Sequence, residues 1–306
     1  MALRPLDNAL PIAPLERPKK QAKLAVPTTV KKQQTDVAVV NDENQAPLPT
    51  HPSSGDAAID YIPSENLSAL PDPVLKIQSL MEGLESKDWT VICESLNTAR
   101  RFALFHSDLM TPVLESVVLV LVKAMKNPRS ALCKTSIMAS SDILKAYGDK
   151  LLLDGTQTDA FSQMLLQLLL KASQDKKFVC EEAQRALNSM IATLTPLPLL
   201  HKLRAYVTHS NLRVRAKAAV SISVCVSKMG LETMKEFGLG ELTSMAADLL
   251  NDKLPEAREA ARSTVILLYR AAMEQVDEKQ DAWEKFCKEF LPSKHVQSII
   301  KLVASQ

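Results

Sequence analysis

The chain has 306 residues, 24% of them charged, and its formal net charge of +2 gives no indication of a nucleic-acid partner. Hydrophobic residues make up 46%, aromatic residues only 4%, and there are 7 glycines, a composition that favours helices over β-sheets. The longest apolar run, residues 117–122, is far too short to span a bilayer, and residues 1–30 contain no apolar leader.

Residues 1–70 are predicted to form a disordered tail, because most of the 17 prolines lie near this segment and its apolar residues follow no period. Residues 33–70 carry only acidic charges, which makes them an acidic spacer after a basic arm. The arm is either a contact segment, for a protein, a nucleic acid or an anionic membrane, or a solvated leader. Its basic residues are Arg4, Arg17, Lys19, Lys20, Lys23, Lys31 and Lys32.

Residues 71–306 are predicted to form one all-α domain. Proline is tolerated in the first turn of a helix, where the N–H that it lacks would be unpaired in any case. Five prolines therefore mark expected helix starts. They are Pro112, Pro128, Pro196, Pro255 and Pro292.

Five short polar turns recur about every forty residues, and each contains an Asp or an Asn. Each turn separates two apolar helices; the helix after the third turn has the buried-face spacing of Val179, Ala183 and Leu187. Two helices per unit of this length indicate a HEAT or armadillo-type solenoid of about six helix pairs, in which the turns line one edge. Turns 1 to 5 are KDW (87–89), KNPR (126–129), QDKK (174–177), SNLR (210–213) and NDKLP (251–255).

The turns and the helices that follow them resemble the TOG domain, the tubulin-binding helical-repeat paddle, and in particular its CLASP-type branch. The chain is also similar to small plant proteins with a single such domain. The resemblance covers roughly residues 70–306. It rests on DWTVICESLNTARR, NPRSALCKTSIMASSDILKAYGDKL, QDKKFVCEEAQRAL, HSNLRVRAKAAVSISV and LPEAREAARST.

The resemblance implies that the turns face tubulin and that Trp89, in turn 1, is a principal anchor. Tubulin is acidic, so basic residues on the turns would steer and complement it. One departure concerns Ile92, where TOG domains often carry an arginine. The implied contact residues are Lys87, Trp89, Arg129, Lys176, Lys177, Arg213 and Lys253.

Each of these assignments has a structural alternative. Trp89 is either exposed for a partner or packed against neighbouring helices at the end of the first repeat. Lys176 and Lys177 are either contacts or solvated loop residues. Arg215 and Arg258 are interpreted as structural arginines of the kind that bridge HEAT repeats, and are left out of the site.

The sequence contains no motif for catalysis, so no enzyme activity, cofactor or metal is expected. The five cysteines form no CxxC pair, which indicates reduced thiols rather than a zinc site or disulfide framework. We expect a cytoplasmic, cytoskeleton-associated protein that binds tubulin or microtubules. The alternative is a general helical-repeat scaffold for some other protein, with no tubulin binding.

Overall fold

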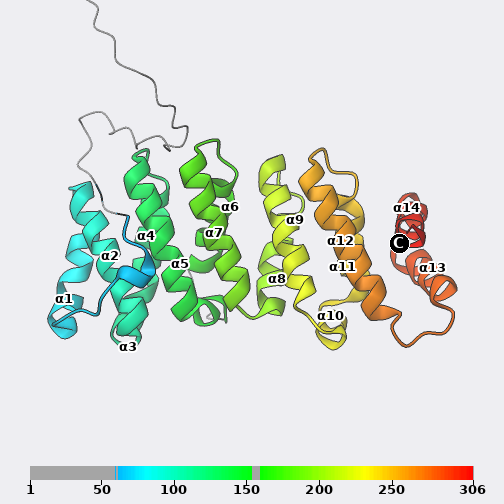
Figure 1. Ribbon diagram of the computed structural model, residues 1–306, viewed down its shortest axis with the longest axis horizontal. Coiled ribbons are helices and arrows are strands. Elements are labelled where there is room, and N and C mark those ends of the chain that lie inside the picture. The colour runs from blue at the N-terminus through cyan, green and yellow to red at the C-terminus, as the bar shows by residue number, and fades with distance from the viewer. Residues whose placement is uncertain (1–58, 60, 154–158, 306) are drawn as a thin grey trace, which may run out of the picture. The chain divides into compact units, whose positions relative to one another are not determined.

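The computed structural model describes residues 59, 61–153 and 159–305, and the predicted helical-repeat fold is confirmed (Figure 1). Over these ranges the chain forms helices and turns, without strands. The long helices are α1 (Pro73–Leu84), α2 (Trp89–Phe105), α4 (Leu114–Met125), α5 (Ser130–Leu153), α6 (Ala160–Ala172), α7 (Lys177–Thr193), α8 (Pro196–Arg204), α9 (Leu212–Ser227), α11 (Leu239–Leu249), α12 (Pro255–Ala272), α13 (Lys279–Phe290) and α14 (Ser293–Ala304). The short elements are η1 (Ser64–Asn66), α3 (Ser107–Met110), η2 (Thr111–Val113) and α10 (Leu231–Phe237).

Helices pair along the chain as α1/α2, α4/α5, α6/α7, α8/α9, α11/α12 and α13/α14. The second helices of successive pairs pack side by side, so α2 contacts α5, α5 contacts α7, α7 contacts α9 and α9 contacts α12. No single pair can bury its apolar face alone, and the stacking joins those faces into a continuous core. Between α9 and α12 the contact is made by alanines, which let the two backbones approach closely: Ala216, Ala219, Ala257, Ala260 and Ala261.

The Asp or Asn in four of the five turns fixes where the next helix begins. Asp88 accepts a hydrogen bond from the Thr90 N–H at 2.9 Å, and Asn127 accepts one from the Arg129 N–H at 2.9 Å. Asn211 and Asp252 repeat the same bond two residues ahead, at 3.0 and 2.9 Å. Short polar side chains that bond to the backbone in this way stabilise a turn before a helix. The repeated Asp or Asn in the sequence is therefore a local folding signal.

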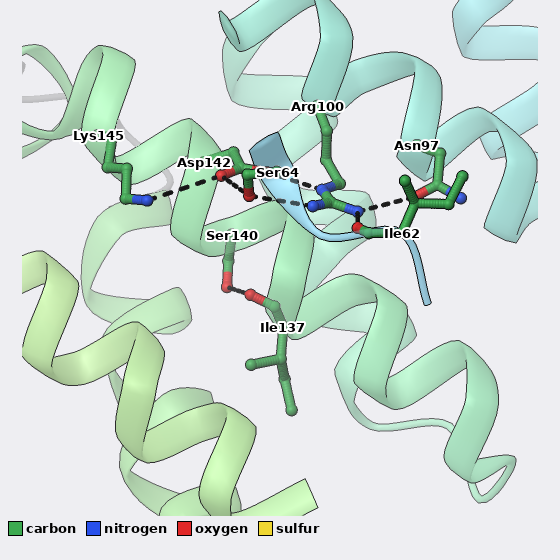
Figure 2. Close-up of polar contacts among 8 residues, drawn as sticks. All are labelled: Ile62, Ser64, Asn97, Arg100, Ile137, Ser140, Asp142 and Lys145. Carbon is green, nitrogen blue, oxygen red and sulfur yellow. Dashed lines mark hydrogen bonds and ion pairs between the residues drawn. The ribbon is translucent and has the colours of Figure 1, made fainter. Parts of the chain in front are cut away.

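The folded domain begins earlier than Pro71, the boundary predicted from the sequence. Leu67 and Leu70 are buried, and the segment before them contacts the buried Arg100 of α2. The Arg100 guanidinium donates to the Ile62 carbonyl oxygen at 2.7 Å and to Ser64 Oγ at 3.1 Å (Figure 2). We call residues 61–70 the strap. The rest of the predicted tail, residues 1–60 with the basic arm, lies outside the described residues apart from Ile59.

Arg100 also binds the carboxylate of Asp142 on α5, with 2.7 Å between Nε and Oδ2. Both side chains are fully buried, and Ser64 Oγ donates to Asp142 Oδ1 at 2.7 Å (Figure 2). Buried charges are costly unless they are paired and hydrogen-bonded. The strap thus completes the coordination of an ion pair between the first two helix pairs.

In the ranges that the structure describes, no helix is long and apolar enough to cross a membrane.

Candidate functional site: the turn edge

In the first five pairs, the turn that joins the two helices lies at the same edge of the stack, the upper edge in Figure 1. The connections from α7 to α8 and from α12 to α13 lie at the opposite edge (Figure 1). We call the edge formed by turns 1 to 5 the turn edge. The seven residues predicted as contacts all lie in these turns or in the first residues of the helices after them.

Trp89 is the first residue of α2 and is half-buried, with part of its ring packed against the core. The exposed Arg129 of turn 2 lies over the indole, with its guanidinium carbon 5.3 Å from the ring centroid. A guanidinium within about 6 Å of a Trp ring makes a favourable cation–π contact. Trp89 is therefore neither a free surface residue nor a core residue: one part of the indole anchors turn 1, and another part stays accessible beside a cation.

Ile92, which stands where TOG domains often have an arginine, lies one turn along α2 from Trp89. It is half-buried and lines a cavity of about 370 Å³ together with Leu84 and Val120. This cavity lies between turns 1 and 2, since Ser86 and Asn127 also border it. The charged side chains that border this cavity are Glu85 and Lys123, and Ile92 contributes an apolar part of its wall.

Turns 2, 3 and 4 are joined by contacts of their own basic residues. Lys176 of turn 3 donates from Nζ to Ser130 Oγ, at the start of α5, at 3.0 Å. Arg213, at the end of turn 4, pairs with Asp175 of turn 3 at 2.5 Å and donates to the Ser173 carbonyl oxygen at 3.2 Å. These side chains are exposed, so each pair contributes little to stability, about 1 kcal/mol or less. Their effect is to fix the direction in which the cations point.

Turns 4 and 5 are joined by a more buried contact. The Arg215 guanidinium binds Asp252 at 2.8 Å and donates to the His209 carbonyl oxygen at 2.8 Å. Partial burial disfavours the ionised form of Asp252, but hydrogen bonds from the Leu254 N–H and from Arg215 outweigh this and lower its pKa. Arg215 thus bridges two repeats, as its sequence position suggested.

Arg258 is structural in a different way from that expected. Its guanidinium donates to the Asp252 and Lys253 carbonyl oxygens, at 2.8 and 3.0 Å. Both acceptors belong to turn 5, directly before the helix that carries Arg258. This arginine therefore closes its own turn instead of reaching the neighbouring repeat.

Lys87, Lys177 and Lys253 are exposed on turns 1, 3 and 5. Lys177 makes a 3.9 Å ion pair with Glu181 one helical turn away, between two exposed side chains. Among the described residues, Lys87 and Lys253 have no ion-pair partner. Of the predicted contact lysines, the two without an ion pair among the described residues thus lie in turns 1 and 5, at the two ends of the turn edge.

The structure adds three residues to this edge that the sequence did not single out. Phe178, next to Lys177, is 43% exposed, and Lys126 and Lys171 border turns 2 and 3. The sequence held a signal for Phe178. This large apolar residue directly follows turn 3 and stands one position before Val179, where the buried face of the next helix begins, so it lies off that face. Lys126 is itself a basic residue of turn 2, so the sequence held a signal for it as well. Lys171 gave no such signal, because only the folded stack brings α6 next to turn 2.

Fold and edge together define a class of protein: a helical-repeat solenoid with a row of apolar and basic turn residues along one edge. Comparison with known families narrows the class. The model of the CLASP N-terminal family matches residues 87–288, so the chain belongs to this family.

Relatives and solved structures agree with this assignment. TOG array regulator of axonemal microtubules protein 1 of Mus musculus is 24% identical over 226 residues, which are 72% of this chain and 12% of the mouse protein. The chain therefore spans a small part of that relative's length. The TOG domain of C. elegans Zyg9 is 16% identical, with a TM-score of 0.56 over 78% of this chain and 89% of that one. A structure from work on TOG–tubulin binding specificity is 13% identical, with a TM-score of 0.53 over 74% and 81%. At these identities the two structures show the fold.

Proposed function

We propose that the chain is a non-catalytic protein that binds tubulin or microtubules through the turn edge, and that it serves microtubule organisation or dynamics at the cytoskeleton in the cytoplasm. Membership of the CLASP N-terminal family supports this proposal, as do the microtubule and tubulin functions named for the mouse relative and the similar TOG structure.

The observation that carries the proposal is the combination of Trp89 with a row of exposed cations on one edge. Trp89 and Arg129 form an amphipathic pair at one end, and Arg213 and Lys253 continue the positive charge toward the other. Aromatic residues and arginines dominate the binding energy of protein interfaces, and positive rims steer acidic partners. An acidic protein surface such as that of tubulin fits this arrangement.

The contacts within the edge also support a docking role. Arg129, Lys176 and Arg213 are each held by a neighbouring turn, so their heads are partly ordered before a partner arrives. Ordering a long side chain on binding costs about 0.5–1.5 kcal/mol, and this cost is reduced when the side chain is already fixed. Arg129 and Lys176 are held by neutral groups, the Trp89 ring and the Ser130 hydroxyl, so they keep their charge for a partner and lose less freedom on binding.

The test is direct binding by the full chain. We expect it to co-elute with unpolymerised tubulin in gel filtration or to pellet with microtubules in co-sedimentation, with binding that weakens as salt rises because the cations are screened. Absence of both interactions at micromolar protein would contradict the proposal and favour a scaffold for another partner.

A further inference from the structure

A small cavity of about 180 Å³ lies between turns 2 and 3 and is bordered by three lysines. Lys126 comes from turn 2, Lys171 from the end of α6, and Lys176 from turn 3. Ser130 and Cys133, on the first turns of α5, form part of the wall. No Asp or Glu of the described chain lines it. We call this cavity the lysine pocket.

The three lysines have no anionic partner within the described residues. The acids nearest in sequence to Lys176 are engaged elsewhere: Asp175 with Arg213, Glu181 with Lys177, and Glu182 with Arg185. Lys176 has a neutral partner only, the hydroxyl of Ser130 at 3.0 Å. The lysine pocket therefore gathers positive charge that the fold leaves uncompensated, and an anion entering it would relieve the mutual repulsion of the lysines.

The charges act on the wall of the pocket as well. Burial raises the pKa of the Cys133 thiol, and the positive charges of Lys171 and Lys176 oppose this rise. Two ammonium groups from different elements are thus close enough to influence one buried group at the base of α5. Lys171 is half-buried, which reduces the screening of its charge by water.

Size limits what the pocket can hold. Pockets for drug-sized ligands are typically about 300–1,000 Å³, whereas a water molecule occupies about 30 Å³. A cavity of about 180 Å³ suits the head of one acidic side chain with a few waters. It opens between two turns of the proposed docking surface, so a protein that covers this surface can insert a side chain while its backbone stays outside.

We propose that the lysine pocket receives the carboxylate of an aspartate or glutamate side chain from the bound protein partner. This inference rests on the proposed function, since it takes the turn edge as the docking surface. It adds Lys126 and Lys171 as determinants of affinity for an acidic partner.

The test compares variants in which one lysine is replaced by glutamine, so that each variant loses one positive charge. Lys171→Gln and, separately, Lys126→Gln are expected to weaken tubulin binding by roughly tenfold each, within the range seen when one partner of a close interfacial charge pair is lost. Lys150→Gln is the control, because Lys150 is exposed near the C-terminal end of the same helix, α5. It should leave binding within about twofold. Lys126 lies in an exposed turn, so its replacement keeps the test valid if Lys171→Gln fails to fold. If both Lys171→Gln and Lys126→Gln bind tubulin as tightly as the wild-type chain, the inference is overturned.

A second measurement separates this inference from the proposed function. A short polyglutamate peptide should shift the backbone amide NMR signals of Ser130 and Cys133 in the wild-type chain and not in the Lys126→Gln/Lys171→Gln variant. If the wild-type chain binds no tubulin, the proposed function is wrong, and the peptide still tests the pocket. Saturation by inorganic phosphate without any response to the peptide would show a phosphate site and overturn the carboxylate assignment.

Discussion

Single residues of the turns contribute to folding, and in the proposed function they also bind the partner; Trp89 and Asp252 show the two extremes. The sequence placed Trp89 at a turn before a helix, which is where the structure has it. What the sequence could not tell was how far the indole is buried against the core and that Arg129, a residue of the next repeat, lies over it. Asp252 was recognised only as a polar turn residue. Its partner Arg215 lies in the preceding repeat, and only the stacked helices bring the two together.

The contact of Asp252 predicts a specific dependence of stability on pH. Because the folded-state pKa of Asp252 is lowered from 3.8, its ionised form stabilises the fold above the unfolded-state pKa, and this contribution is lost as pH falls through the folded-state value. Asp252→Asn should therefore lower the free energy of unfolding at pH 7 by roughly 1.5–3 kcal/mol. The difference from wild type should shrink below about pH 4.

Urea unfolding between pH 7 and pH 3 measures this difference. Asp277→Asn serves as the control, since Asp277 is an exposed residue of the α12–α13 connection, and it should change the free energy of unfolding little at any pH. A gap between wild type and Asp252→Asn that stays constant down to pH 3 would show that the effect does not come from ionisation.

At the scale of elements, the helices and their order followed from periodicity, proline positions and turn residues, and the strap did not. Residues 61–70 contain Pro63 and no helical stripe, so they were assigned to the tail. They are ordered by tertiary contacts, above all by Arg100, which stands on the buried face of α2. The partners of Arg100 lie several tens of residues away from it in the sequence. Helical periodicity and turn residues are local signals, so they carry no information about such contacts.

The strap gives a second prediction about stability. Residues 59–306 should melt at the same temperature as the full chain, whereas residues 71–306 should melt about 5 °C lower or more. Removal of the strap deletes Leu67 and Leu70, whose burial stabilises the fold by about 1.5–3 kcal/mol per side chain. It also removes the acceptors of two hydrogen bonds that Arg100 donates. For a domain of this size each kcal/mol shifts the melting temperature by about 2–4 °C.

Point variants separate the strap's polar contacts from its length. Ser64→Ala removes the hydroxyl that bonds both Arg100 and Asp142 and should lower the melting temperature. Ser68→Ala, at an exposed strap position, should not. Equal melting temperatures for residues 59–306 and 71–306 would show that the strap contributes nothing to the fold.

At the scale of the whole domain, the turn edge is a product of stacking. Each turn contributes one or two cations, and the stacking of the helix pairs brings the five turns onto one edge. The repeat period was sufficient to predict that the turns share an edge. It was not sufficient to predict which neighbouring turns contact each other, because the Lys176–Ser130 and Arg213–Asp175 contacts depend on the packing of adjacent helix pairs.

The measurement that tests the central claim most directly is the affinity for unpolymerised tubulin of two variants at opposite ends of α2. Trp89→Ala alters the first residue of this helix, on the turn edge, and Phe105→Ala alters its last residue, which is 46% exposed. If the turn edge is the docking surface, Trp89→Ala weakens binding by at least about tenfold, as expected for a hot-spot tryptophan. Phe105→Ala then stays within about twofold of wild type. Normal binding by a folded Trp89→Ala variant, or an equal loss in both, would contradict the account.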